Sequence, residues 1–318
     1  MKQLACFLII IGFAFGCGGA DEASGQFPEW KASVKVTDES GQPISGADMT
    51  IYYDLPSKNH EIVHLSKKGK TDKNGIFTAS GRTTSVSLDF QATKEGFYKT
   101  DLEHDLGPFI NPDPVKWNPN VALVLKRIGQ PIAMYAKRLN IYVPVLDKPV
   151  GFDLSVGDWV EPFGKGLKTD IIFAGQHIKK APQDYEDKLA VTFPNEGDGI
   201  QGFSASFKLM EGSALRSPHE APESGYEPQL VKRNVSVPNQ PLIYDFDAKT
   251  NYFFRVRTVL DEHGNIKSAL YGKIYGDFMQ FTYYLNPVAN SRNMEFDTNQ
   301  NLFKAKDLRD RSVRILMP

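Results

Sequence analysis

Residues 30–54 read WKASVKVTDESGQPISGADMTIYYD, and this stretch decides the fold class. Ala32, Val34 and Val36 alternate with polar residues, which is the period of two expected for a strand with one buried face. Residues 38–41 then have the composition of a turn, and a second alternating run follows. The stretch therefore predicts two strands joined by a turn, at the start of an all-β domain.

The same pattern continues to about residue 125. Residues 71–75 read TDKNG, and Asn-Gly supplies the positive φ angles that a tight hairpin turn requires. Residues 85–92 alternate again, and residues 121–125 form a last apolar run. Residues 100–120 hold four prolines and predict a long connection across one end of the domain. No long amphipathic helix is predicted anywhere in the chain.

Three segments carry a family resemblance: VTDESGQPISGADMTIYYD, TDKNGIFTAS and FQATKEGFYKT. They resemble the carboxypeptidase regulatory-like domain, a transthyretin-like β-sandwich. The resemblance covers residues 30–127. It implies a non-catalytic spacer or docking module, since the family has that role on many secreted proteins. The features that match are Gly41, Pro43, Gly46, Ala47, Thr71, Asp72, Gly75, Gly96 and Phe97.

Residues 128–131, Ile-Gly-Gln-Pro, break the pattern and predict a domain boundary. Residues 131–318 are again β-rich and predict a second, larger antiparallel β-sandwich or jelly-roll-like domain. Its clearest unit is a long hairpin, in which residues 252–259 and 267–275 flank a turn with glycine. Three pieces of this part resemble lipoproteins of environmental bacteria that have no assigned activity: KRIGQPIAMYAKRL, GFDLSVGDWVEPFGKG and YYLNPVANSRNMEFD. The other strands are expected at 139–145, 150–154, 169–173, 188–193, 203–209, 242–246 and 278–285.

The first 17 residues predict where the protein is located. Lys2 precedes a 12-residue apolar run, too short for the ~20 residues of a membrane span. This is the layout of a secretory signal. Ala-Phe-Gly-Cys at its end resembles the lipobox of bacterial lipoproteins, which implies cleavage before Cys17 and acylation of its sulfur. An ordinary signal peptide is the alternative. We expect a signal peptide at 1–16, a flexible tether at 17–29 and a membrane partner reached through the lipid.

Composition narrows the choice of partners and compartment. The chain has 37 basic and 38 acidic residues, so charge gives no reason to expect nucleic acid. The two cysteines are Cys6 in the signal and Cys17, so no disulfide and no cysteine-ligated zinc is expected in the mature chain. Gly18, rather than an aspartate, follows the cysteine, which resembles lipoproteins exported to the outer membrane under enterobacterial sorting and implies a position facing the periplasm or the surface. We expect a cell-envelope protein without a cofactor.

No catalytic or metal motif emerges from the sequence. HExxH and Gly-x-Ser-x-Gly are absent, and His60 and His64 fall on a predicted strand or loop, where a spacing of four does not bring them together. The acidic segments 195–199 and 297–301 have oxygen ligands of the kind calcium takes, but the same residues favour turns. The sequence therefore predicts no catalytic residue and no metal site, and leaves calcium open.

The candidate ligand site lies at residues 157–166. Trp159 and Phe163 supply rings for stacking, and Asp158 and Glu161 supply hydrogen-bonding groups. The first interpretation is a non-enzymatic binding or assembly module, whose ligand would be an envelope glycan or protein. The alternative is a polysaccharide hydrolase that uses the carboxylates near Trp159, since such enzymes need two carboxylates in one cleft. A purely structural lipoprotein is the third possibility, and for Trp159 itself the alternative is a role in the core.

Overall fold

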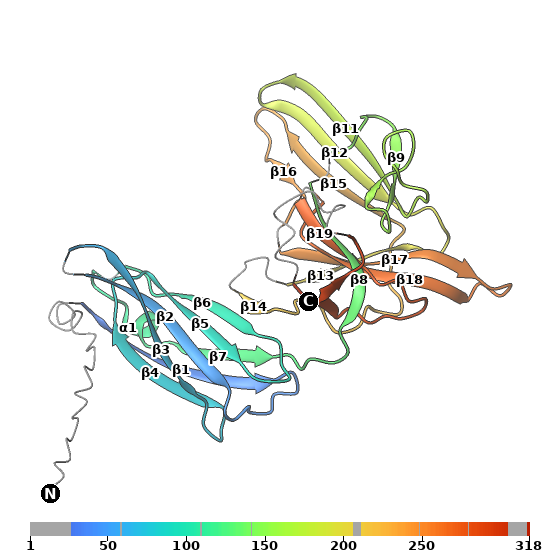
Figure 1. Ribbon diagram of the computed structural model, residues 1–318. Helices are drawn as coiled ribbons and strands as arrows, with labels where there is room; N and C mark the ends of the chain where they lie inside the picture. Colours follow the sequence, from blue (N-terminus) through green and yellow to red (C-terminus); the bar gives the residue numbers. More distant parts are fainter. Residues whose placement is uncertain are drawn as a thin grey trace, which may run out of the picture.

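A computed structural model describes the chain over residues 27–57, 59–108, 110–140, 142–205, 211–247, 249–278, 280–304 and 317–318. The predicted signal peptide, Cys17 and most of the tether lie outside these residues. The all-β prediction is confirmed, because strands grouped in four sheets make up most of the described chain. The sheets form two sandwiches, joined by a short linker near residues 126–131 (Figure 1). No helix in the described ranges has the length and apolar character needed to cross a bilayer.

The first sandwich packs a three-stranded sheet, in the order β4-β1-β7, against a sheet in the order β14-β6-β5-β2-β3. The predicted alternation in β1 is observed, because Ala32, Val34 and Val36 are buried. They meet Met49, Ile51, Leu88 and Phe90 of the opposite sheet. The elements are β1 (Glu29–Asp38), β2 (Asp48–Pro56), β3 (Ile62–Lys70), β4 (Ile76–Arg82), β5 (Ser87–Thr93), β6 (Thr100–Asp105), α1 (Pro114–Trp117), β7 (Asn120–Leu125) and β14 (Gly212–Ser213).

The Asn-Gly turn lies between β3 and β4, but the predicted hairpin is wrong, because β3 and β4 belong to different sheets and the turn connects the two sheets. Gly75 has φ +74°, and a Cβ there would lie 2.4 Å from the Val36 carbonyl oxygen. The proline-rich connection differs from the prediction. Residues 100–105 form strand β6, which pairs with β5, and the helical turn α1 follows with Trp117 buried in the core. Backbone pairing with β5 therefore takes up the first third of the predicted connection.

The second sandwich consists of two six-stranded sheets, β10-β9-β11-β12-β15-β16 and β13-β17-β18-β19-β8-β20. Phe152 and Phe173 of one sheet pack against Phe254, Ile274 and Tyr283 of the other. The elements are β8 (Ile132–Asn140), β9 (Pro149–Asp153), β10 (Asp158–Trp159), β11 (Ile171–Ala181), β12 (Asp184–Thr192), β13 (Gly199–Ser204), β15 (Gln229–Ser236), β16 (Ile243–Tyr244), β17 (Thr250–Leu260), β18 (Ile266–Tyr275), β19 (Gln280–Leu285) and β20 (Phe296–Asn301).

Two expectations for this domain are wrong. The strand predicted at 139–145 instead spans Ile132–Asn140, and the chain after it forms a loop that covers Gly175. Strand alternation puts Tyr283 and Tyr284 on opposite faces of β19, so one of the two is expected to face solvent, but both are buried. Tyr283 lies between the two sheets. Tyr284 lies on the opposite face, beside Met134 and Phe296 of its own sheet, and the backbone of Met317 reaches its hydroxyl from outside the sheet.

Candidate functional site

The predicted site, residues 157–166, is a tight loop at one end of the second sandwich. Trp159 lies in β10, which pairs with β9, and its ring is only partly exposed. The indole packs edge-on against Phe152 and Phe173, with ring centroids 5.3 and 5.5 Å apart. Trp159 thus closes the end of the core, and little of its face is available for stacking.

The polar groups of this loop are mostly used to hold the loop itself. The Asp158 carboxylate accepts hydrogen bonds from the backbone N–H groups of Trp159 and Lys165. A Cβ at Gly164 would lie 2.4 Å from the Trp159 carbonyl oxygen, so this glycine permits close packing within the loop rather than contact with a partner. Glu161 is exposed, and Phe163 is 45% exposed. Of the four predicted residues, only Glu161 and Phe163 face solvent freely.

A buried ion network lies behind the loop and links the two sheets. Arg257 of β17 donates two hydrogen bonds to Asp170, at 2.7 and 2.8 Å. Its guanidinium also lies 3.3 Å from Asp153 and 2.9 Å from the Ser155 hydroxyl. The Asp170 side chain is fully buried. The carboxylates of Asp153 and Asp170 both have their hydrogen-bond partners within the protein. The network therefore has a structural role.

The network shifts the pKa values of its members. Burial opposes ionisation of Asp153, but hydrogen bonds from Ser155 and from the N–H groups of Leu167, Lys168 and Val156 outweigh burial and lower its pKa. The hydrogen bonds to Asp170 raise the pKa of Arg257, against the effect of burial. Both groups therefore stay charged at neutral pH.

The two segments considered for calcium have their oxygens occupied. The Asp198 carboxylate accepts from Thr258 N–H, Arg257 N–H and the Asn195 amide, and burial raises its pKa. Asp297 accepts from Asn299 N–H and the Gln300 amide. No group of three or more His, Cys, Asp or Glu residues suited to a metal occurs in the described part of the chain. Turn formation accounts for both segments.

A fully buried lysine is equally structural. The Lys273 ammonium donates to the Met294 carbonyl at 2.6 Å and lies 4.9 Å from the ring centres of Tyr275 and Tyr284. Burial lowers its pKa well below the usual value. No part of Lys273 is exposed, so it fastens residue 294 to the sheet and has no access to a substrate.

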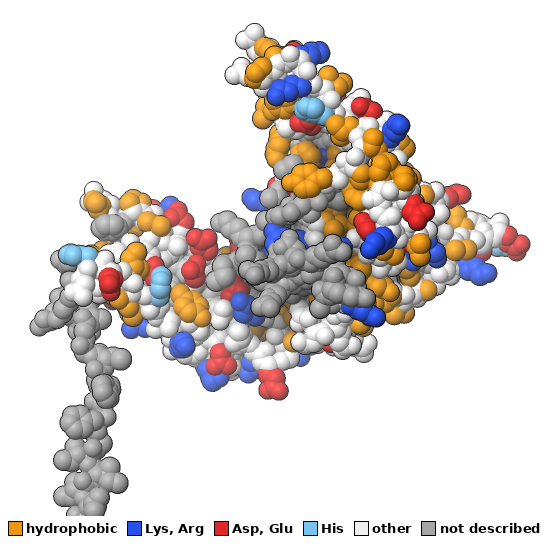
Figure 2. Space-filling view, turned by 45° about the horizontal axis from the view of Figure 1, so that its top comes forward, with side chains coloured by type: hydrophobic (Ala, Val, Ile, Leu, Met, Phe, Trp, Pro, Cys, Tyr) orange, Lys and Arg blue, Asp and Glu red, His pale blue; other side chains and the backbone are white. Residues whose placement is uncertain are grey.

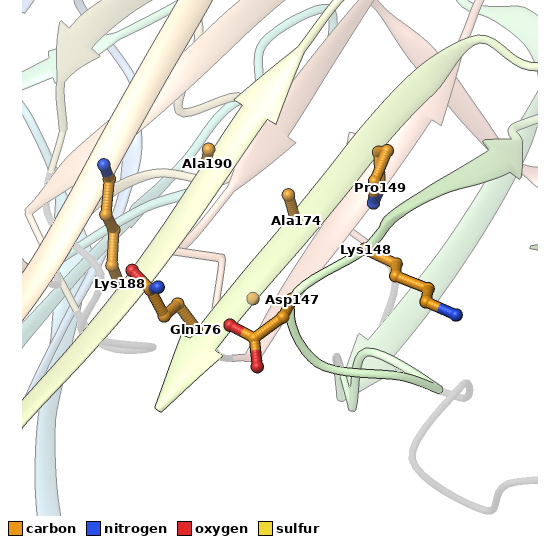
Figure 3. Close-up of a pocket in the computed structure, with 8 residues that line it drawn as sticks. Asp147, Lys148, Pro149, Ala174, Gln176, Lys188 and Ala190 are labelled. Atoms are coloured by element: carbon orange, nitrogen blue, oxygen red, sulfur yellow. The ribbon is translucent and has the colours of Figure 1, made fainter. Parts of the chain in front are cut away.

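A shallow hollow of about 280 Å³ lies on the outer face of β11 and β12 (Figure 3). Ala174 and Ala190 lie in its floor, with Gln176 and Lys188 together at one end. Lys148 extends away from it. The hollow has no aromatic ring, and its small floor residues provide few groups that could select a ligand.

A larger hollow, about 380 Å³, lies on the outer face of the first sandwich, and we call it the β2–β5 hollow. Strand register explains it. Tyr52 of β2 pairs with Asp89 of β5, and Asp54 pairs with His64 of β3, so these side chains share one face. Its lining residues are Tyr52, Tyr53, Asp54, His64, Ser85, Ser87, Asp89 and Gln91.

The β2–β5 hollow contains an unpaired carboxylate. Asp54 accepts from His64 at 2.7 Å, and Gln91 donates to Asp101 at 2.9 Å. Asp89 is half-buried, and none of the described residues donates a hydrogen bond to it. Burial and the nearby charges of Glu103, Asp54 and Asp101 raise its pKa. The Tyr52 side chain beside it is 38% exposed.

Sequence reasoning missed the β2–β5 hollow because its members come from strands up to 39 positions apart, Tyr52 to Gln91. The sequence held one indication of it: the residues of β5 that point outward are all polar, namely Ser87, Asp89 and Gln91. Such a row is common on any solvated strand, so it does not identify a site. Only the register places the row beside Tyr52.

No family model and no curated protein matches this chain. Among solved structures, 3-chlorocatechol 1,2-dioxygenase from Rhodococcus opacus 1CP is 12% identical, with a TM-score of 0.26, over 33% of this chain and 62% of the dioxygenase. Shaft pilin SpaA from Lactobacillus rhamnosus GG is 14% identical, with a TM-score of 0.21, over 74% of this chain and 89% of the pilin. A DUF3823 family protein from Parabacteroides merdae ATCC 43184 is 9% identical, with a TM-score of 0.22, over 85% of this chain and all of that one. TM-scores this low carry no conclusion about the activity of this chain.

Proposed function

We propose that this chain is a lipid-anchored protein of the cell envelope, placed at the outer membrane, and that it acts as a non-enzymatic binding module. The lipobox-like end of the apolar start supports the anchor. The regulatory-like sequence features of residues 30–127 support a non-catalytic role for the first sandwich. Acidic and basic side chains are interspersed over the face shown in Figure 2, which suits an uncharged partner better than a nucleic acid.

The β2–β5 hollow carries the binding proposal. A half-buried carboxylate without a donor is unfavourable, and a ligand that brings O–H groups would correct this. The Tyr52 ring next to Asp89 offers a flat apolar surface, and Ser87 and Gln91 add further polar groups. Hydroxyl donors together with flat apolar faces are the chemistry of a sugar. We therefore assign the hollow to an envelope glycan.

The hydrolase alternative has less support at Trp159. The carboxylates of Asp153 and Asp158 are held by the protein, which leaves Glu161 as the exposed acid of that loop. A hydrolase needs two carboxylates about 5–10 Å apart on either side of the scissile bond. Release of reducing sugar ends from a bound glycan remains the direct assay for this alternative.

Replacing the groups of the β2–β5 hollow should weaken glycan binding. A panel of uncharged oligosaccharides of the kinds found in envelope glycans supplies the probes, and titration calorimetry measures the affinity. Asp89→Asn is expected to weaken binding roughly 10- to 100-fold, because a charge-assisted hydrogen bond is lost. Tyr52→Ala is expected to weaken it roughly 3- to 10-fold.

Two matched variants control for indirect effects. Tyr142→Ala removes a tyrosine that is 82% exposed in the other domain, and Asp48→Asn alters β2 outside the hollow. Both should bind as the unaltered protein does. Equal affinity of all four variants for the bound glycan would place the glycan elsewhere. Absence of binding to every sugar in the panel would refute the glycan assignment.

The anchor is tested by Cys17→Ser, which removes the sulfur that carries the lipid. The variant should leave the detergent phase and appear in the soluble envelope fraction or the medium, since two or three acyl chains otherwise hold a protein on a bilayer almost permanently. Phase separation in a cloud-point detergent measures the change. A variant that still partitions with the detergent would show that acylation of Cys17 is not the anchor.

A further inference from the structure

Glu295 forms the centre of the contact between the two sandwiches. Its side chain is only 5% exposed. One carboxylate oxygen accepts from the Tyr98 hydroxyl of the first sandwich at 2.7 Å and from Gly129 N–H of the linker at 2.8 Å. Burial opposes ionisation, but these hydrogen bonds and His219 outweigh it and lower the pKa of Glu295. Glu295 is therefore a fixed, ionised acceptor at the junction.

His219 connects this acceptor to a second carboxylate in the other sandwich. Its Nδ1 lies 2.8 Å from Glu295, and its Nε2 lies 3.0 Å from Glu39. Glu39 follows β1, in a turn where Asp38 accepts from Ser40 and Gln42. Gly41 has φ +81°, which closes this turn. The turn is therefore preformed and presents Glu39 to the imidazole of the second domain.

Both ring nitrogens of His219 thus face carboxylate oxygens, and this geometry requires a ring that carries a proton on each nitrogen. A neutral imidazole has one N–H and one lone pair, whereas the imidazolium has two N–H donors. Only the imidazolium can donate to Glu39 and Glu295 together. In the neutral ring, one nitrogen would present its lone pair to a carboxylate.

We propose that the Glu39–His219–Glu295 bridge is a proton-dependent clamp between the two sandwiches, a property that goes beyond the binding function. The clamp is closed when His219 carries both protons. When the ring loses one, the remaining proton stays on Nδ1, because Glu295 is buried and held in place by Tyr98 and Gly129. The Nε2 lone pair then faces Glu39, whose side chain is 41% exposed and can turn to water.

The direction of the pH effect follows from this proton requirement. Because only the doubly protonated ring can donate to both carboxylates, the Glu39 contact is present at lower pH and is lost when a rise in pH removes one ring proton. The ring contacts the carboxylates of Glu39 and Glu295, and these in turn interact with three further titratable groups: Lys126, Lys273 and Tyr98.

Other contacts keep the sandwiches together when the clamp opens. Strand β14 adds to the first sandwich by pairing with β6, and the Lys126 ammonium donates to the Ser217 carbonyl. The Asn293 amide donates to the Gln130 carbonyl in the linker. None of these contacts requires a proton on histidine. The clamp therefore controls how tightly residues 217–221 are held against the turn at 38–42, and the domains stay joined.

Hydrogen–deuterium exchange of the full-length protein tests this proposal at about pH 5.5 and pH 8, on either side of the histidine range. Exchange rates are corrected for their intrinsic pH dependence. Protection in peptides covering 38–42 and 217–221 should fall roughly 3- to 10-fold at the higher pH, as expected for the loss of one hydrogen bond. Circular dichroism at both pH values verifies that the fold is retained.

Three variants separate the clamp from a general effect of pH. Glu39→Ala should show the low protection at both pH values. Glu39→Gln should show high protection at both, because its amide can accept from Nε2–H or donate to the lone pair. Glu262→Ala removes the carboxylate of an exposed His–Glu pair, with His263, and should behave as the unaltered protein. Equal protection of the unaltered protein at both pH values, or an unchanged pH response in Glu39→Ala, would overturn the proposal.

Discussion

Arg257→Ala is expected to lower the free energy of unfolding of the second domain by about 3–5 kcal/mol, because it leaves buried carboxylates without their cation. Asp170 loses both of its guanidinium hydrogen bonds and stays enclosed. Asp153 loses the same partner but keeps its bonds from Ser155 and the backbone. Urea unfolding followed by circular dichroism measures the change.

The backbone at Arg257 supports a specific role for this side chain. Arg257 has φ +57°, a conformation that is uncommon outside glycine and costs about 1–3 kcal/mol when the surroundings impose it. It lies where the register of β17 and β18 shifts, so the strand bulges there. The bulge turns the guanidinium toward the opposite sheet. The contacts to Asp170 offset the strain.

A surface arginine provides the matched control for this prediction. Arg233 pairs with Asp245 at 2.8 Å, but both side chains are partly exposed, at 49% and 30%. Arg233→Ala should change stability little, since water replaces an exposed ion pair at small cost. Equal losses in Arg233→Ala and Arg257→Ala would contradict the special role of the buried network.

The same network predicts a loss of stability in acid. The pKa of Asp153 is lowered in the folded state, so its contribution is fully present above the ordinary aspartate value of ~3.9 and is lost as the pH falls through the lower, folded-state value. The pKa of Asp198 is raised by burial, so protonation of Asp198 stabilises the folded state as the pH falls. Unfolding curves measured between about pH 7 and pH 3 should therefore show that the free energy of unfolding falls near the acid end of this range.

Local chemistry predicted much of the fold. The alternation of Ala32, Val34 and Val36 placed β1, and Asn74-Gly75 placed the turn between β3 and β4, because both signals act between near neighbours in the chain. Tyr284 shows where local reasoning fails. Its burial depends on residues far away in sequence, such as Met134 in the neighbouring strand and Met317, and a strand pattern contains no information about such neighbours.

The long-range polar contacts were harder to predict for the same reason. His219 contacts residues 180 positions before it and 76 positions after it, and Arg257 contacts Asp170 from 87 positions away. Neither grouping forms a motif along the chain. The candidate loop at 157–166 was found because its polar and aromatic residues are adjacent in sequence. Adjacency, however, did not reveal that Asp158 and Gly164 serve the loop itself.

Trp159→Ala is expected to lower the free energy of unfolding by about 2–4 kcal/mol, slightly less than for a fully buried tryptophan, because part of the ring is exposed. The loss has two sources. The indole fills the end of the core against Phe152 and Phe173, and each edge-on ring pair contributes about 0.5–1.5 kcal/mol beyond burial. Thermal unfolding should shift downward by roughly 5–15 °C.

Phe163→Ala is the matched variant, because Phe163 lies in the same loop, is 45% exposed and makes no ring contact with the described residues. Its melting temperature should stay nearly unchanged. If the loop also binds a ligand, Phe163→Ala weakens that binding without a change in stability, whereas Trp159→Ala affects both. An unchanged melting temperature in Trp159→Ala, together with weaker binding, would reverse this assignment and make Trp159 the contact residue. The pair thus separates the residue that closes the core from the residue that faces a partner, which the sequence alone presented as one aromatic cluster.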